Sequence, residues 1–437
     1  MILEIKKKYS IMLSIIVGAT IMRKIYTGID LGSDNVKIVV SEYLENKFHI
    51  LASTSVKSVG IKKGLIIDHD MAVNSLKLAI NEIERTLGTR VTEAIITVPS
   101  NNRKLSVVSG KVEIKGENNL VDGMDIINCL ENAMSAGKIE EQDEVVSIIP
   151  ITFNVDDKES LVDPKNQQGE FLEVKAVLAT APKKNIYEYF KVFSECNIKI
   201  LDLTFSGIGD YYEACGKDTM NTIGAMINVG SETINISIFN KGILIKNEII
   251  PLGSKNIDKD ISYIYGVDLN VAKELKEKFA VCSRRYADIN DTLEINLNEN
   301  EKIAINQYEI TEVVESRVVE LLKLAKKQIN DLTKRKISYI IVTGGISELT
   351  GFSYVVENIL GINASTLNMT TIGIRNNKYS SAIGIIKYFH DKMSLRNKDI
   401  TMIDQDKIDE LMKNKKSMIE LSEDTLISKL FGYITNN

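Results

Sequence analysis

One short polar stretch has residue types and a spacing that could do chemistry. It reads Asp30-Leu31-Gly32-Ser33-Asp34-Asn35-Val36-Lys37 and lies between two apolar runs. Small residues in such a turn let backbone N–H groups approach phosphate oxygens, and Gly32 permits the required conformation. Asp30 can hold a hydrated magnesium ion, and Lys37 can neutralise phosphate charge. An ordinary hairpin with a polar turn explains the same residues, so the stretch alone does not decide the function.

This stretch lies inside a pattern of strands that occurs twice. Alternation and β-branched residues in the first copy predict three strands, a helix and a further strand, over 25–30, 36–41, 48–55, 71–87 and 94–99. The second copy has the turn Gly230-Ser231-Glu232-Thr233 and predicts strands over 223–229, 234–239 and 243–250. A repeat this long indicates a duplicated α/β domain rather than a solenoid. Two similar domains leave a cleft between them, which is a usual place for a ligand.

Composition narrows the class of protein without giving its function. With 437 residues, 44% of them hydrophobic and 26% charged, the chain is globular and long enough for two or more cores. Its net charge is −5 with both signs mixed, so no basic field predicts nucleic-acid binding. The four cysteines are far apart and form no metal-binding pattern, which favours a reduced cytosolic chain: Cys129, Cys196, Cys215 and Cys282. The three histidines are equally scattered and argue against a histidine-based metal centre: His49, His69 and His390.

The N-terminus allows two interpretations. Lys6-Lys7-Lys8 precede an apolar run over 9–22, and Val17-Gly18-Ala19 could be a cleavage site, which is the layout of a signal peptide. The run is short for a transmembrane helix. Alternatively Met22 is the true start, because Met22-Arg23-Lys24 leads directly into the first strand. We favour Met22, since the rest of the chain is built for a cytosolic ligand, and treat 1–22 as an uncertain leader or a mis-assigned start.

Three segments, in this order, resemble the nucleotide site of the actin, Hsp70 and sugar-kinase superfamily. The stretch 30–37 resembles its first phosphate loop, and Gly230-Ser231-Glu232-Thr233 after Met226-Ile227-Asn228-Val229 resembles its second. Ile340-Ile341-Val342-Thr343-Gly344-Gly345 resembles its adenosine motif. The resemblance implies ATP in the cleft, with Mg²⁺ bound through ATP near Asp30 and no direct metal ligand. The residues implied for this site are Asp30, Gly32, Ser33, Asp34, Asn35, Lys37, Asn228, Gly230, Ser231, Glu232, Thr233, Lys276, Gly344, Gly345 and Ile346.

Further segments resemble one family of this superfamily in particular, the bacterial cell-division protein FtsA. This resemblance covers nearly the whole chain from Ile25 onward. Gly60-Ile61-Lys62-Lys63-Gly64-Leu65-Ile66-Ile67-Asp68 resembles the segment after the first hairpin of that family. Three segments resemble its inserted subdomain of the SHS2 type: Ile148-Ile149-Pro150, Val162-Asp163-Pro164 and Gly169-Glu170-Phe171-Leu172. The implied fold class is α/β, with duplicated actin-like, RNase H-like domains, this insertion and a C-terminal amphipathic helix.

The resemblance also implies how the chain is divided and which parts bind partners. In that family the insertion contacts the next protomer of a filament, and the small subdomain docks the C-terminal tail of FtsZ, the tubulin-like division protein. Arg284-Arg285 in the small subdomain could meet an acidic peptide, although surface solvation explains an arginine pair as well. The expected parts are a first actin-like subdomain (23–104 and 182–217), the insertion (105–181), a second actin-like subdomain (218–253 and 331–392), the small subdomain (254–330), a linker (393–421) and a membrane-targeting helix (422–437).

The C-terminal residues themselves predict an amphipathic helix. Ser422 suits an N-cap, and Glu423 and Asp424 suit a first helical turn. One face of the helix carries five apolar residues, Leu426, Ile427, Leu430, Phe431 and Ile434. Because a linker separates this face from the core, a membrane surface is the favoured partner, and a helix folded back on the body is the alternative.

Several departures from the superfamily pattern indicate binding rather than fast hydrolysis. Asn228 stands where an Asp is usual, and an amide cannot carry the charge that helps to position magnesium and water. The glycines of the second loop are reduced to Gly230, and Ile346 replaces a common third glycine of the adenosine motif. Lys273 replaces a glutamate that touches the ribose. We therefore expect ATP to act as a structural ligand with at most slow hydrolysis, and we assign no catalytic residue.

The leading hypothesis is an ATP-binding, actin-like cell-division protein on the cytoplasmic side of the cell membrane at the division site. It would polymerise there, tether FtsZ through its tail and recruit other division proteins, with no nucleic-acid partner. One rival with the same fold is a true phosphotransferase or ATPase, which needs a carboxylate base that Asn228 does not supply. Another is an actin-like scaffold ATPase of a pilus or secretion assembly.

Overall fold

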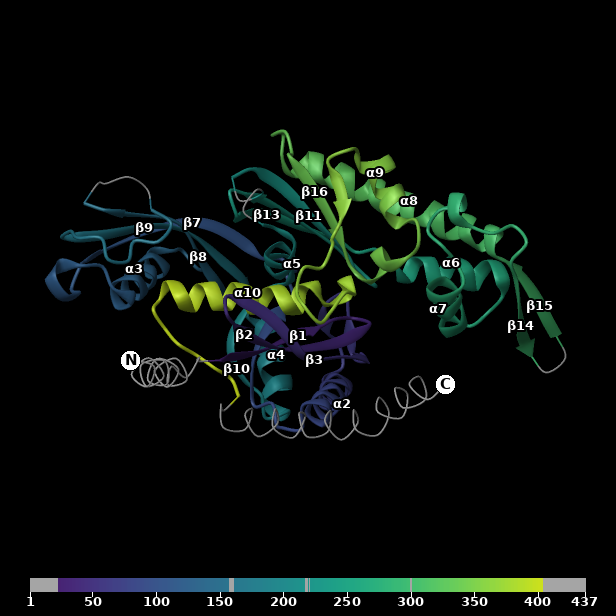
Figure 1. The fold of residues 1–437 in the computed structure, drawn as a ribbon, viewed down its shortest axis with the longest axis horizontal. Helices are drawn as coiled ribbons and strands as arrows, with labels where there is room; N and C mark the ends of the chain where they lie inside the picture. The colour runs from purple at the N-terminus through teal and green to yellow at the C-terminus, as the bar shows by residue number, and fades with distance from the viewer. Residues whose placement is uncertain (1–22, 157–160, 217–218, 220, 299–300, 404–437) are drawn as a thin grey trace, which may run out of the picture.

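The first sheet carries the turn over 30–37. The structure, a computed structural model, describes residues 23–156, 161–216, 219, 221–298 and 301–403 (Figure 1). The first sheet has the order β10-β6-β1-β2-β3, in which β1 is antiparallel to β2 and parallel to β6. Its strands are β1 (Lys24–Leu31), β2 (Asn35–Leu44), β3 (Lys47–Lys57), β6 (Glu93–Val98) and β10 (Lys199–Phe205).

The second sheet repeats this arrangement and confirms the predicted duplication. Its order is β13-β12-β11-β16-β17, with β11 antiparallel to β12 and parallel to β16. The register of the two hairpins is also equivalent, since Asp30 pairs with Lys37 in the first and Asn228 with Asn235 in the second. The strands are β11 (Ile223–Val229), β12 (Ile234–Asn240), β13 (Ile243–Ile250), β16 (Tyr339–Thr343) and β17 (Ala364–Thr366).

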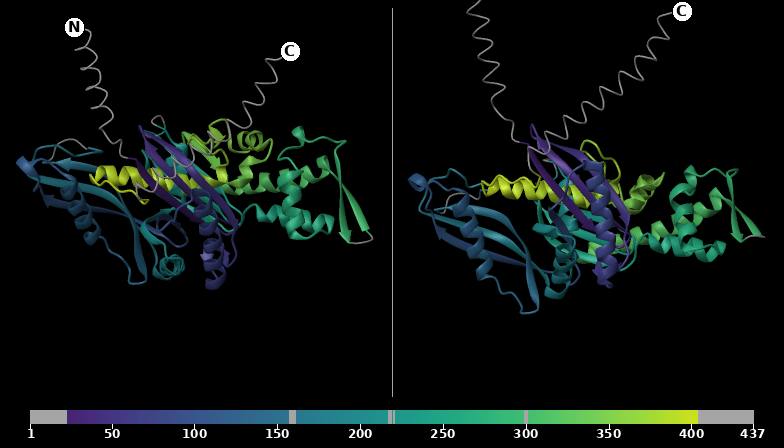
Figure 2. Two further views of the ribbon diagram at one scale, coloured as in Figure 1. Left: turned by 60° about the horizontal axis from the view of Figure 1, so that its bottom comes forward. Right: turned by 90° about the horizontal axis from the view of Figure 1, so that it is seen from below.

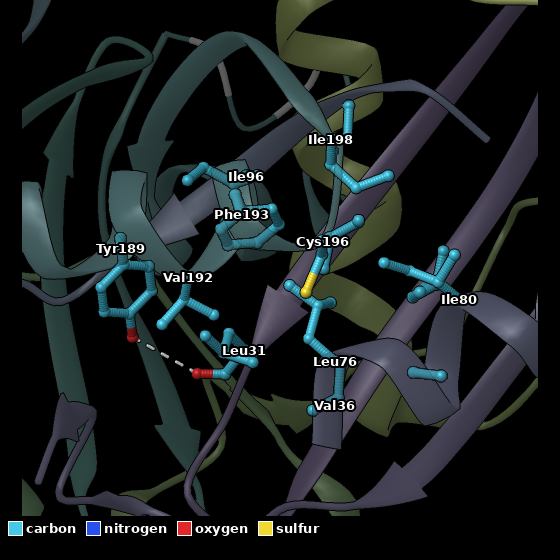
Figure 3. Close-up of a cluster of buried hydrophobic side chains, with 14 of the residues drawn as sticks. Leu31, Val36, Leu76, Ile80, Ile96, Tyr189, Val192, Phe193, Cys196 and Ile198 are labelled. Carbon is cyan, nitrogen blue, oxygen red and sulfur yellow. Dashed lines mark hydrogen bonds between the residues drawn. The ribbon is translucent and has the colours of Figure 1, made fainter. Parts of the chain in front are cut away.

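Helices α2 (His69–Leu87) and α4 (Lys183–Glu195) cover one face of the first sheet. Figure 3 shows part of this core, with Leu76 of α2 and Phe193 of α4 in one cluster with strand residues. In the same cluster the Tyr189 hydroxyl donates to the Leu31 carbonyl at 3.4 Å. Burial of these apolar faces fixes the ends of β1 and β6, where the candidate site begins.

Helices α8 (Gln307–Leu332) and α9 (Phe352–Leu360) cover the second sheet. The small subdomain extends from this part of the molecule and lies at the right-hand end of Figure 1. The side chain of Asn306 caps α8 by accepting the backbone N–H groups of Tyr308 and Glu309. The other elements of the small subdomain are α6 (Lys255–Tyr265), α7 (Leu269–Lys278), η2 (Arg284–Tyr286), β14 (Thr292–Asn298) and β15 (Glu301–Asn306).

The inserted subdomain lies at the opposite end of the molecule from the small subdomain (Figures 1 and 2). Its sheet has the order β7-β9-β8, and Leu130 of its helix packs in a core with Val174 and Leu178 of the sheet. Its elements are β7 (Lys104–Glu113), η1 (Glu117–Asn119), α3 (Gly123–Ala136), β8 (Asp143–Val155) and β9 (Phe171–Pro182). The remaining short elements of the molecule are β4 (Ile61–Lys62), β5 (Leu65–Ile66), η3 (Gly345–Glu348) and η4 (Asn377–Tyr379).

Two helices, α5 (Ser206–Ala214) and α10 (Ser380–Leu395), cross between the two sheets. On the first sheet, Tyr26 and Ile95 are buried against α10. On the second sheet, Met226 and Phe239 are buried with residues of α5. The backbones of the two helices come together at a pair of glycines, because a Cβ on Gly384 would lie 1.7 Å from the carbonyl oxygen of Gly209.

Helix α10 corrects two predicted boundaries. The sequence assigned 331–392 to the second subdomain, but α10 packs on the first sheet. The linker expected from 393 also begins later, since α10 continues to Leu395, which packs on the core of the inserted subdomain. Beyond it, Met402 and Ile403 are buried in cores of the first domain. The first residues of the predicted linker therefore belong to the body, because these apolar side chains hold them there.

The predicted leader (1–22) and the membrane-targeting helix with Leu426, Ile427, Leu430, Phe431 and Ile434 lie outside the described residues. Within the part of the chain that the structure describes, no helix combines the length and the apolar character needed to cross a membrane. Cys129, Cys196, Cys215 and Cys282 are free thiols in the structure.

The helix crossing yields a prediction for stability. Gly384→Ala places a methyl group against the Gly209 carbonyl, so the helices must separate, and we expect the free energy of unfolding to fall by about 1–3 kcal/mol. Ser394→Ala, at an exposed position of the same helix, is the control and should change it by less than about 0.5 kcal/mol. Urea titration measures both, and equal stabilities of the two variants would contradict the close crossing.

Candidate functional site

A cleft of about 500 Å³ lies between the two domains, at the carboxyl ends of β1, β6, β11 and β16. Each residue that the sequence predicted for nucleotide binding lines it. The fold thus brings together the three predicted motifs, namely Asp30, Gly32, Ser33, Asp34, Asn35 and Lys37, then Asn228, Gly230, Ser231, Glu232 and Thr233, then Gly344, Gly345 and Ile346, along with Lys276 of α7.

The two turns that line the cleft are closed in the same way. The Gly32 N–H donates to the Asn35 carbonyl at 3.1 Å, and the Gly230 N–H donates to the Thr233 carbonyl at 2.9 Å. A Cβ on Gly32 would lie 2.9 Å from the Asn35 carbonyl oxygen and 3.0 Å from Lys37 Nζ. Only glycine therefore fits the first turn without a shift, and the backbone itself forms this part of the cleft wall.

The carboxylate of Asp30 is held at the cleft by two neighbours. Its Oδ2 accepts Lys37 Nζ at 2.8 Å, and its Oδ1 accepts the Thr97 hydroxyl at 2.7 Å. The Asp30 and Lys37 side chains are 15% and 16% exposed, so the ion pair still reaches solvent in the cleft. The sequence analysis did not select Thr97, because this residue lies within the apolar strand β6.

The paired glycines after β16 allow a close backbone contact. Gly344 has φ +110, and a Cβ there would lie 2.3 Å from the Val229 carbonyl oxygen. The end of β16 can therefore pack directly against the second turn. Ile346, which departs from the superfamily pattern, turns its side chain into the core of the second domain while its residue borders the cleft.

A buried carboxylate lies directly behind Asn228. The Asn228 side-chain amide donates to Asp210 Oδ2 at 2.8 Å, and the Ser380 and Ser381 hydroxyls donate to Asp210 Oδ1 at 2.6 and 2.8 Å. Asp210, on α5, is 0% exposed, and this burial raises the pKa of its carboxyl to about 6. The sequence analysis missed Asp210, because no local motif marks a partner 18 positions before Asn228.

The family is decided by two models that match different parts of the chain. The model of the SHS2 domain inserted in FtsA matches residues 101–180, and the model of cell division protein FtsA matches residues 225–384. The chain belongs to the FtsA family. Cell division protein FtsA of Bacillus subtilis (strain 168) is 28% identical over 367 residues, 84% of this chain and 83% of that protein. FtsA of Enterococcus hirae is 24% identical, over 83% and 82% of the two chains.

Solved structures show that this member of the FtsA family has the actin-like fold. A PilM–PilN type IV pilus biogenesis complex aligns with a TM-score of 0.56 at 14% identity, over 83% of this chain and 98% of that chain. MreB5 of Spiroplasma citri, in a structure bound to AMPPNP, aligns with a TM-score of 0.53 at 12% identity, over 86% and 98%. The predicted family is confirmed, and so is the predicted α/β, actin-like fold with its SHS2 insertion, while the C-terminal amphipathic helix of that prediction lies outside the described residues.

The cleft of this FtsA-family chain is rich in lysine. Lys276 Nζ lies 2.6 Å from Asp258 Oδ1, and both side chains are less than a tenth exposed. Lys63 and Lys378, which the sequence analysis did not select, also line the cleft. Burial, together with the nearby charges of Lys37 and Lys273, lowers the pKa of Lys378. A polyanion bound among these ammonium groups would relieve their mutual repulsion.

Glu232 connects the second turn to the first domain. Its Oε2 accepts the Lys63 backbone N–H at 2.8 Å, and its Oε1 lies 2.9 Å from Lys255 Nζ. Burial alone would raise the pKa of Glu232, but the bond to Lys255 and the N–H of Lys63 lower it. The ionised side chain thus links both walls of the cleft rather than pointing freely into it.

Proposed function

We propose that this chain binds ATP in the cleft between its two actin-like domains. The observation that carries the proposal is the convergence of two glycine turns and the Gly344-Gly345 motif on one cleft lined by ammonium groups. Backbone turns without a Cβ suit phosphate oxygens, and lysines suit the negative charge of a triphosphate. The MreB5 structures bound to ADP and AMPPNP support nucleotide binding by this fold.

Magnesium fits the same site through the carboxylate of Asp30. When bound with ATP, the ion would neutralise phosphate charge while keeping most of its waters, and Asp30 would hold those waters. Lys37, which contacts Asp30, would meet the phosphates directly. This division of roles agrees with the position of both side chains at the cleft wall.

We propose that hydrolysis is slow and that ATP acts as a structural ligand. A fast ATPase needs a base aimed at water in the cleft. Asn228 is neutral, and Asp210 behind it is fully buried and bonded to three donors. Neither group supplies such a base, so bound ATP would hold the two domains together for assembly.

We further propose that the chain polymerises on the cytoplasmic side of the cell membrane at the division site, tethers FtsZ and recruits other division proteins. Membership of the FtsA family supports this role. The small subdomain would take the FtsZ tail, and it exposes apolar side chains such as Tyr263 and Ile289. Arg284 is bonded to Glu312 and Glu315, which leaves Arg285, stacked over Tyr354, as the better partner for an acidic peptide.

A scaffold ATPase of a pilus assembly is the second candidate. The PilM–PilN complex supports it only through the shared fold. The two FtsA models favour the division role. Co-purification of the chain with FtsZ, rather than with an inner-membrane pilus subunit, would decide between the two.

The first prediction for this function concerns ATP binding. Gly32→Val should block the first turn, and Lys37→Ala should weaken binding by about 1.5–3 kcal/mol, roughly 10- to 100-fold in affinity. Titration with fluorescent ATP measures both. Gly216→Val is the control, because a Cβ at Gly216 meets open space, and it should leave the affinity unchanged. If both turn variants bind ATP with wild-type affinity, the assignment of this turn to phosphate binding is wrong.

The second prediction concerns hydrolysis. Asn228→Asp alone would place two carboxylates within hydrogen-bond distance, so one of them would stay protonated. Combining Asn228→Asp with Asp210→Asn keeps the hydrogen bond and moves the charge to the cleft. We expect the double variant to release phosphate several times faster than wild type or the single variant, at similar ATP affinity. Unchanged turnover in the double variant would show that another step limits hydrolysis.

The third prediction concerns the membrane. A helix over 423–434 would span about 18 Å, long enough to lie on a bilayer but not to cross it. One such helix should bind lipid weakly, whereas a polymer presents many side by side. We therefore expect the chain to pellet with anionic liposomes more strongly with ATP than without.

Three variants test the helix itself. Phe431→Asp should abolish pelleting, because it brings a charge into the apolar face, while Lys429→Ala should only weaken it. A chain that ends at Leu421 should stay soluble and still bind ATP. If it pellets as well as the full chain, the helix is not the anchor.

A further inference from the structure

One ion pair connects the two domains across the cleft. Lys273 Nζ lies 2.7 Å from Asp34 Oδ2. Asp34 belongs to the turn between β1 and β2 of the first domain, and Lys273 belongs to α7 of the small subdomain. Both residues line the cleft, and both side chains are 31% exposed. The bond therefore lies where the cleft opens to solvent.

The two partners are fixed to different hydrophobic cores. Leu31 and Val36, on either side of the turn, belong to the core of the first domain. Ala272 and Leu275, on either side of Lys273, belong to the core of the second. The domains are joined at the floor of the cleft, where Ser206 of α5 and Ser381 of α10 line it. A bond on the open side resists a separation of the domains about that floor.

Two further contacts join the two domains. Lys57 Nζ lies 3.5 Å from Asn270 Oδ1, at the start of α7. Glu232 accepts the Lys63 backbone N–H at 2.8 Å. Of these three contacts only the pair of Asp34 and Lys273 joins two full charges, so it is the strongest candidate to hold the domains closed.

The ion pair also solves a problem of charge in the first turn. A carboxylate among groups that would surround a triphosphate repels the ligand unless a cation neutralises it. Burial would raise the pKa of Asp34, but the bond and charge of Lys273 outweigh it and lower that pKa. Asp34 thus stays ionised and paired, and the turn presents no net negative charge to the ligand.

We propose that Asp34 and Lys273 form an ionic latch that keeps the cleft closed over its nucleotide and slows nucleotide release. The proposal rests on the ATP-binding function proposed above and assigns Lys273 the role of a positioning residue. Release requires the domains to separate, and separation breaks this bond. The latch therefore acts on the dissociation rate more than on the association rate.

Release of fluorescent ATP from the full chain, chased with excess unlabelled ATP in a stopped-flow instrument, tests the latch. Lys273→Gln and Asp34→Asn should each release the nucleotide about 3- to 5-fold faster than wild type, as loss of a partly exposed ion pair implies. The double variant should be no faster than either single variant, because both remove the same bond. Lys273→Arg, which keeps the charge, should restore slow release.

Lys278→Gln is the matched control, since Lys278 lies on the same helix, is exposed and pairs at 3.5 Å with Glu274 of its own helix. Its release rate should equal that of wild type. Wild-type release in Lys273→Gln, or additive effects in the double variant, would overturn the latch while leaving ATP binding intact. A wild-type chain that binds no fluorescent ATP would overturn both proposals. Small-angle scattering of the protein without nucleotide adds a second readout. Lys273→Gln should increase the radius of gyration, because the two domains can then separate. An unchanged radius of gyration would contradict the claim that the ion pair holds the cleft closed.

Discussion

The crossing of α5 and α10 is the constraint on which the rest of the structure depends. Helix α10 packs on the first sheet and helix α5 on the second. The two helices contact each other at Gly384 of α10 and Gly209 of α5. A larger residue at either position would keep the two helix backbones further apart, so these two glycines set the distance between the sheets. That distance in turn fixes the width of the cleft, because β1 and β11 both end at it.

The same crossing buries a carboxylate, which is costly unless its oxygens are hydrogen-bonded. Asp210 meets this requirement by accepting bonds from both helix α10 and strand β11. One of these donors is the side-chain amide of Asn228, which is neutral. The carboxylate of Asp210 therefore lies on the core side of the second turn rather than in the cleft.

The sequence predicted the local parts of this molecule well. Period-two alternation located the hairpin strands, and the glycine turns identified the cleft walls, since both signals depend on residues close in the chain. Contacts between distant residues carried no such signal. Asp210 and Asn228 are 18 positions apart and Asp34 and Lys273 are 239 apart, so neither partner marks the other. Met402 and Ile403 were assigned to the linker for a related reason, because two apolar residues near the end of a chain do not reveal which core they enter.

The position of α10 near the end of the chain has a consequence for synthesis on the ribosome. The face of the first sheet that carries Tyr26, Val39 and Ile95 is made early, yet the helix that covers it emerges last among the described helices. The N-terminal domain therefore cannot complete its core as an independent unit, in contrast to the usual order in which N-terminal domains fold first. Until Ser380 and the residues after it leave the ribosome, this apolar face is open to chaperones, and folding of the two domains finishes together.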